Sequence, residues 1–347
     1  MLIHLLSIGA QQTVPGNPEQ NDDNRNEVVE DSIDYNSFWN YNFQFNGSTI
    51  GSSRILPDFE NEEVKILNLD PVDNKEKNAF FSMLDMEKGK FRNTVFSLRI
   101  DSLTTYFVNF LRADQLYNDF IFYGNGTDLK IRDYEENVFH NVSLDSIPHP
   151  YYEPEYFNFT SSEKWLNLGE PIVAEWLSEK DGNGLGLRLW QIGSPYNDYY
   201  TFNSPVPQTD LSQEKDSIEI TTRPSLMVRQ NGINGINSPF ISVVEPIIDK
   251  PMVKAVTLLF SDPNHSVLKV NLEKGITDFV IVSTDGSPIV TDGFRFKGAG
   301  GIIRTNRGQV SDLYLVNGTE LKTGKYELIS ETPQSVSKRF HIRKRQR

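Results

Sequence analysis

Short apolar runs separated by dense turn residues are the feature that most constrains the fold of this chain. From about Phe38 onward these runs recur roughly every 8–15 residues, and no long segment shows the period of an amphipathic helix. Phe, Tyr and Trp make up 12% of the sequence, and aromatic residues favour strands. The pattern therefore predicts an all-β fold: a large antiparallel β-sandwich with a smaller C-terminal β part.

Two hairpins are indicated by their turns. Apolar segments at residues 79–87 and 91–100 flank Lys88-Gly89-Lys90, and segments at 172–180 and 185–193 flank Asp181-Gly182-Asn183-Gly184. Further strands are expected at residues 64–69, 105–113, 119–124, 128–134, 217–223, 225–230 and 240–246.

Three parts are predicted along the chain. Residues 1–34 combine an N-terminal strand with an acidic, Asn-rich loop, residues 35–250 form the sandwich, and residues 251–347 hold C-terminal strands and a basic tail. The C-terminal strands form either a small domain of their own or the closing strands of the sandwich. The apolar start, MLIHLLSIGA, lacks the basic residues and the length of a signal peptide, which favours a strand.

Charge and composition exclude several classes of function. The net charge of −13 argues against a nucleic-acid partner, and no apolar run is long enough for a membrane span. The basic residues from Lys338 to Arg347 read either as a contact for an anionic polymer or as a solvated tail, and the acidic remainder of the chain favours the tail. Without cysteine, neither a disulfide nor a thiolate metal site can form.

No motif assigns a catalytic residue, a metal ligand or a cofactor. The five histidines show no metal-binding spacing, and no Gly-x-Ser-x-Gly sequence is present. Gly298, Gly300 and Gly301 are expected to serve bulges or a turn. A hydrolase that uses a pair of carboxylates to cleave glycosidic bonds stays open as one hypothesis, because the spacing of two carboxylates in a β-fold cannot be read from their separation in sequence.

Several segments, taken in order, resemble the C-terminal β-sandwich of the heparinase II/III-like polysaccharide lyases, including related alginate lyases. They are YFVNFLRADQLYNDFIFYGNG from Tyr106, WLSEKDGNGLGLRLWQIG from Trp176 and RPSLMVRQNGINGINSPFISVVEP from Arg223. The last is the most specific, since the family has a strand, an Arg, a short loop and then a strand similar to "pFvsvfeP". The resemblance spans roughly residues 60 to 330.

The resemblance implies β-elimination on uronic-acid polysaccharides and a periplasmic or extracellular location. Family members draw their catalytic groups mostly from an N-terminal α/α toroid, and no part of this sequence has that helical pattern. The chain alone is therefore expected to be inactive, with an acidic polysaccharide and a separate toroid domain as its partners. The alternative is a non-catalytic module that binds carbohydrate or another protein.

Four residues are candidates for substrate binding: Arg112, Tyr123, Arg188 and Trp190. Arginine binds carboxylates through two parallel hydrogen bonds, and aromatic rings pack on sugars. For Trp190 and Tyr123 the competing interpretation, packing in the core, is favoured. Tyr123 also stands where the family often has a metal-binding histidine, and this argues against a metal here.

Overall fold

The computed structural model describes residues 250–341 without a gap and, between residues 39 and 248, the strands with a few adjoining residues. Residues 1–38, residues 342–347 and the segments between those strands lie outside the described part. The expected N-terminal strand, the acidic loop, His140 and His149 all fall there.

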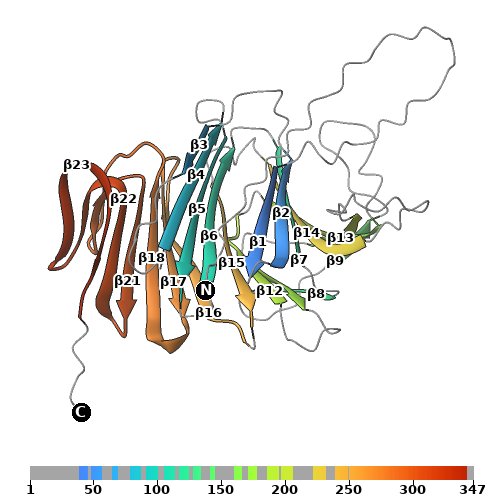
Figure 1. The fold of residues 1–347 in the computed structure, drawn as a ribbon. Coiled ribbons are helices and arrows are strands. Elements are labelled where there is room, and N and C mark those ends of the chain that lie inside the picture. The colour runs from blue at the N-terminus through green and yellow to red at the C-terminus, as the bar shows by residue number, and fades with distance from the viewer. Residues whose placement is uncertain are drawn as a thin grey trace, which may run out of the picture.

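Three antiparallel sheets lie side by side as layers (Figure 1). In spatial order the first sheet contains β1 (Trp39–Phe45), β2 (Ser48–Leu56), β7 (Tyr117–Gly124), β14 (Thr222–Asn231), β13 (Asn197–Pro205), β10 (Thr160–Trp165) and β9 (Asn141–Leu144). The middle sheet contains β3 (Lys65–Asn68), β4 (Ala79–Met86), β5 (Phe91–Arg99), β6 (Thr105–Ala113), β15 (Phe240–Ile247), β12 (Gly186–Gln191), β11 (Ile172–Leu177) and β8 (Asp128–Asp133).

The third layer, the C-terminal sheet, is built entirely from residues beyond 250. It contains β16 (Val253–Ser261), β17 (His265–Leu272), β18 (Ile276–Ser283), β21 (Gly300–Asn306), β22 (Gln309–Thr323), β20 (Arg295–Lys297) and β19 (Ile289–Val290), while β23 (Tyr326–Arg339) pairs with β22. The C-terminal strands therefore form a sheet of their own and do not close the first sandwich.

The all-β prediction is confirmed, and so are both hairpins. β4 pairs with β5, and β11 pairs with β12, each in antiparallel register. The strand expected at residues 64–69 is β3. The described helix is a single 3-10 turn at Glu273–Gly275. Within the described residues, no helix has the length and apolar character needed to cross a membrane.

The central strands of the middle sheet are buried on both faces, as expected of a central layer. Its side chains alternate between two cores, because successive residues of a strand point to opposite faces. One face meets the first sheet through a cluster that includes Phe122, Trp176, Leu189, Leu226 and Phe240. The other face meets the C-terminal sheet through a cluster that includes Phe96, Val108, Trp190, Leu268 and Val280.

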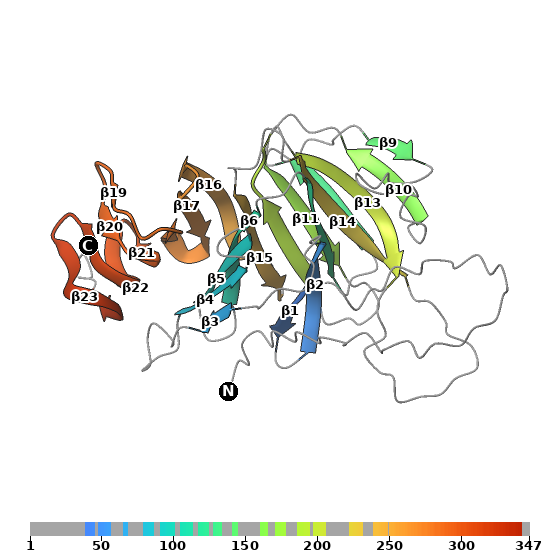
Figure 2. The ribbon, with the colours of Figure 1, turned by 90° about the horizontal axis from the view of Figure 1, so that it is seen from above.

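The far end of the C-terminal sheet curls over a third core (Figure 2). β22 causes the curl, since its first half pairs with β21 and its second half pairs with β20. The β22–β23 register breaks on both sides of Gly318. A Cβ at Gly318 would lie 2.5 Å from the carbonyl oxygen of Lys297, so only glycine allows this close approach.

Two of the three glycines near residue 300 have a different role from the one predicted. Gly298 does lie in a bend, but Gly300 and Gly301 belong to β21, whose register with β18 is regular there. A Cβ at Gly300 would lie 2.7 Å from the ring of Phe81 and 2.8 Å from that of Phe96. The missing side chain therefore lets the C-terminal sheet approach the aromatic rings of the middle sheet.

A buried ionic cluster joins these two sheets. The Arg304 guanidinium donates to both carboxylate oxygens of Asp278 at 2.7 Å and to the carbonyl oxygen of Arg99 at 2.7 Å. The Tyr106 hydroxyl donates to Asp278 at 2.5 Å. Burial, together with the charge of Asp278, raises the pKa of Tyr106, so the phenol stays protonated as a donor.

Candidate functional site

A small cavity lies where the middle sheet meets the turn between β16 and β17. Arg112 of β6 lines one side, and Asp262, Asn264 and His265 line the other. The cavity measures about 20 Å³, which admits about one water molecule. One of the predicted substrate-binding residues thus lies beside polar groups of the C-terminal sheet.

The turn at this cavity is fixed by its own sequence, Asp-Pro-Asn-His. Asp at the first position and Pro at the second favour a tight turn. The Asp262 carboxylate accepts hydrogen bonds from the backbone N–H groups of Asn264 at 2.7 Å and of His265 at 2.8 Å. The backbone N–H of Asp262 donates to the carbonyl oxygen of His265 at 2.9 Å. These bonds hold the carboxylate beside the imidazole.

His265 bridges two loops of the C-terminal sheet. Its Nδ1 lies 2.9 Å from each carboxylate oxygen of Asp262, and its Nε2 lies 2.7 Å from Oγ of Ser287. Burial acts to raise the pKa of Asp262, but hydrogen bonds from His265 and from the backbone of the turn lower it overall. Through these two contacts the imidazole fastens the turn to the loop after β18.

Arg112 joins this cluster through Asn264. Nη1 of Arg112 donates to Oδ1 of Asn264 at 3.3 Å, and Nδ2 of Asn264 donates to Asp285 at 2.9 Å. Asp285 in turn accepts from the backbone N–H of Ser287 at 2.8 Å and from the Ser283 hydroxyl at 3.1 Å. A continuous polar network therefore links the middle sheet to the C-terminal sheet, with a half-buried guanidinium at its start.

Arg188 and Trp190 lie together on β12, but away from this cavity. Arg188 donates to Glu175 and lies 3.7 Å from Glu245, and its guanidinium is 5.8 Å from the centre of the Trp190 ring. Trp190 is only 5% exposed and belongs to the core between the middle and C-terminal sheets. The surroundings of Trp190 match the packing alternative, and its role in substrate binding stays a prediction.

The carboxyl group of Glu245, near Arg188, has a raised pKa. It is fully buried, and its Oε2 accepts from the backbone N–H groups of Met252 at 2.7 Å and Val253 at 2.9 Å. Burial raises its pKa to about 7, against the opposing effects of these hydrogen bonds and of Arg188. Glu245 thus secures the segment that leads from β15 into the C-terminal sheet.

Tyr123 lies on β7 in the first sheet, a different layer from the other three candidates. Its backbone is in register between Ser52 of β2 and Ser225 of β14. The orientation of its side chain lies outside the described part, and its substrate role stays a prediction. Beside it, a Cβ at Gly124 would lie 2.6 Å from Trp176, so close packing explains this glycine.

The structure does not bring the four predicted residues into one site. Both β6 and β12 pair with β15, and Arg188 stands opposite Glu245 of β15. Arg112 stands opposite the position six residues earlier, so the two arginines are separated by roughly 20 Å along the strands. Sequence reasoning assigned no role to Asp262, His265 or Glu245. The Asp-Pro-Asn turn was a usable signal for the first two, whereas no local pattern marks Glu245. Among the described residues, no group of three His, Asp or Glu side chains could hold a metal ion.

Comparison with known proteins matches one part of the chain. No curated protein matches the chain. Residues 253–340, about a quarter of the chain, match a family model described as the endo-acting ulvan lyase C-terminal domain. These residues correspond closely to the C-terminal sheet, including the Asp262–His265 turn. The C-terminal sheet is therefore similar to a polysaccharide-lyase domain, which supports a polysaccharide-lyase module in general terms.

Proposed function

We propose that this chain is the C-terminal β-sandwich module of a heparinase II/III-like polysaccharide lyase that acts by β-elimination on uronic-acid polysaccharides. The observation that carries the proposal is the match of residues 253–340 to an ulvan lyase domain. That domain packs on the middle sheet, which carries at least one strand of each of the three segments that resemble heparinase-type lyases: β6, β11 with β12, and β15. The finer assignment to the heparinase type rests on that resemblance.

In this proposal Arg112 contacts an acidic group of the polysaccharide. The guanidinium begins the polar network at the junction of the two sheets, and a guanidinium pairs with a carboxylate in bidentate geometry. His265, held by Asp262, positions the turn that lines the same cavity. The groups that abstract the proton and protonate the leaving oxygen come from a separate α/α toroid domain, and the location is periplasmic or extracellular, both as the resemblance implies.

A second candidate is a non-catalytic module that binds carbohydrate. The size of the Arg112 cavity is consistent with it, because about 20 Å³ admits only about one water molecule, so a saccharide would lie on the surface at this junction. In this alternative the chain holds a polysaccharide on its surface and takes no part in cleavage.

The two candidates are tested with the chain alone and then with a toroid domain added. Ulvan, alginate, heparin and heparan sulfate are incubated with the chain while the absorbance of unsaturated product is followed. The proposal predicts no product from the chain alone and faster cleavage when it is combined with a lyase toroid domain. Product from the chain alone would contradict an external catalytic domain, and cleavage that the chain leaves unchanged would favour the non-catalytic module.

A further inference from the structure

A second hollow lies at the opposite end of β18 from the Arg112 cavity. Its volume is about 330 Å³, which falls in the range of small-molecule sites. Ile276, at the start of β18, lines this hollow, whereas Val282, near the strand's end, lines the Arg112 cavity. The two sites are thus separated by most of an eight-residue strand, roughly 20 Å.

Four adjacent strands present alternating charges beside this hollow. Asp278 of β18 is in register with Arg304 of β21, Arg304 with Asp312 of β22, and Asp312 with Arg339 of β23. The first two charges are buried in the cluster that joins the sheets. The last pair is open to solvent on one side, since the Arg339 side chain is 48% exposed while Asp312 is 10% exposed.

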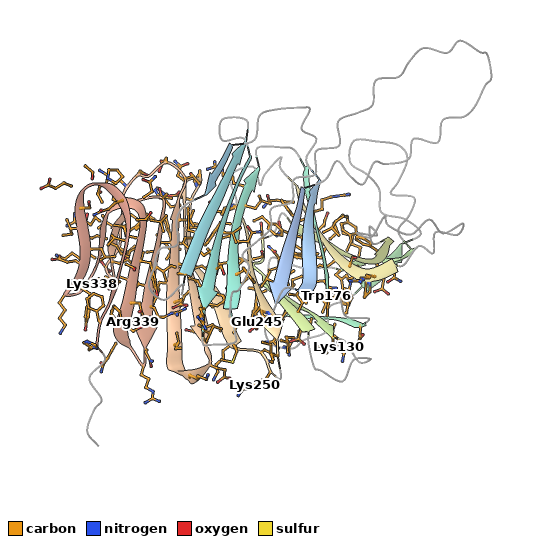
Figure 3. The ribbon with its side chains drawn as sticks, viewed as in Figure 1. Lys130, Trp176, Glu245, Lys250, Lys338 and Arg339 are labelled. Atoms are coloured by element: carbon orange, nitrogen blue, oxygen red, sulfur yellow. The ribbon has the colours of Figure 1, made fainter. Side chains whose placement is uncertain are left out.

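The Arg339 guanidinium is anchored to the sheet by Asp312. Nε donates to Asp312 at 2.8 Å, which fixes the direction of the planar group. Figure 3 shows Arg339 on the C-terminal sheet, well away from Glu245 and Lys130 on the middle sheet. An oriented, half-exposed guanidinium at a hollow is suited to a carboxylate or a sulfate group.

The remaining lining suits a sugar. The half-buried Phe340 ring packs edge-on against Tyr326 with centroids 4.7 Å apart, and it adds an apolar surface to the wall. Hydrogen-bonding groups surround it on Asn306, Ser311 and His341. A mixture of one aromatic ring, polar side chains and a fixed cation suits a charged sugar.

The surrounding charge favours an anionic ligand. Two arginines and one aspartate line the hollow, and because Arg304 is neutralised by the buried Asp278, Arg339 is the solvent-exposed cation of the lining. Six of the ten residues from Lys338 to Arg347 are Lys or Arg, and none is acidic, although the chain as a whole carries −13. The basic charge of the sequence is therefore concentrated at its C-terminal end, and of these six residues Lys338 and Arg339 belong to the described part.

We propose that the hollow at Arg339, Phe340 and His341 is a second binding site for an anionic saccharide, separate from the Arg112 cavity. This inference rests on the proposed function for its ligand class. It assigns to the C-terminal sheet a contact that holds a carboxylated or sulfated chain, with Arg339 pairing with the acidic group and Phe340 lying against the sugar ring.

The test is a titration of the full chain with ulvan oligosaccharides, using isothermal calorimetry. Arg339→Gln should weaken binding roughly tenfold, because the positive charge that attracts the acidic group is lost. Arg295→Gln is the matched control, since Arg295 also pairs through Nε with a carboxylate of the same sheet, Glu320, but does not line the hollow. That control should bind within about twofold of the wild type.

Three outcomes would overturn the inference. A second variant, His341→Ala, leaves the Arg339–Asp312 pair intact. The first contradicting outcome is that Arg339→Gln and His341→Ala both bind as tightly as the wild type. The second is equal weakening by Arg295→Gln, and the third is equally tight binding of a DNA duplex, which would indicate unspecific attraction of polyanions. Binding lost with Arg112→Gln but kept with Arg339→Gln would reject this second site alone, whereas a wild type that binds no acidic polysaccharide would reject the proposed function as well.

Discussion

At the scale of single residues, buried charges hold the joint between the middle and C-terminal sheets. Glu245 accepts two backbone hydrogen bonds from the segment that enters the C-terminal sheet. Asp278, Arg304 and Tyr106 join the same two layers further along. Loss of a buried hydrogen bond, or a change in the protonation of a buried group, alters the free energy of unfolding, so both groups give measurable predictions.

Glu245 should make stability depend on pH. Its pKa in the folded state is about 7, above the ordinary 4.5, so between these values the folded protein holds a proton that the unfolded chain has released. The free energy of unfolding should therefore fall by about 3 kcal/mol from pH 5 to pH 8, with most of the loss below pH 7.

Urea denaturation of Glu245→Gln tests this prediction, because glutamine keeps the acceptor oxygen and does not titrate. The variant should gain about 3 kcal/mol relative to the wild type between pH 5 and pH 8. The exposed Glu327, substituted in the same way, is the control. An identical pH-dependent gain in both variants would argue against Glu245 as the source.

Tyr106→Phe should lower the free energy of unfolding by about 2 kcal/mol, because it removes a buried hydrogen bond to a charged group. Tyr326→Phe, which keeps the ring contact with Phe340, should change it by less than about 0.5 kcal/mol. Denaturant titration at pH 7 compares the two, and equal effects would contradict a stabilising role for the Tyr106–Asp278 bond.

At the scale of elements, the strands and hairpins could be predicted, whereas the layer that each strand joins could not. Turn residues and short apolar runs located β4, β5, β11 and β12, since these signals are local. Layer membership depends on which face meets which sheet. A strand buried on both faces, such as β15, is apolar at nearly every position and carries no such signal.

Gly300 is the element-scale test of this packing. Gly300→Ala would place Cβ within 2.8 Å of two buried aromatic rings, and the overpacking should cost about 1–3 kcal/mol. Gly293→Ala is the control, because its Cβ would meet nothing closer than 3.9 Å. Thermal denaturation of both variants checks the prediction, and equal midpoints would show that the sheets can separate slightly without cost.

At the scale of the whole molecule, the C-terminal sheet depends on its neighbour. One of its faces supplies Val256, Leu268, Val270, Val280 and Val282 to the core shared with the middle sheet. Expressed alone, residues 251–347 would leave this face in water, and we expect aggregation or strong binding of a hydrophobic dye. A cooperatively unfolding monomer that binds no dye would contradict this dependence.

The candidate site was predictable only in part. Arg112 was named from a family resemblance, and the structure places it at a junction of two sheets. Its neighbours Asn264 and His265 lie about 150 residues away in sequence, so only folding reveals their proximity. Arg188 and Trp190 share one strand, and Trp190 is buried because a third layer covers it, which local patterns could not indicate.

The central claim, a polysaccharide-lyase module that binds uronic-acid polymers through Arg112, is tested most directly by titrating the full chain with ulvan. The account predicts saturable binding, no binding of neutral dextran, and roughly tenfold weaker binding by Arg112→Gln. Lys130→Gln removes an exposed charge at the far edge of the same sheet and should bind as the wild type does (Figure 3). Equal binding by Arg112→Gln and the wild type, or no binding of ulvan, would contradict the account.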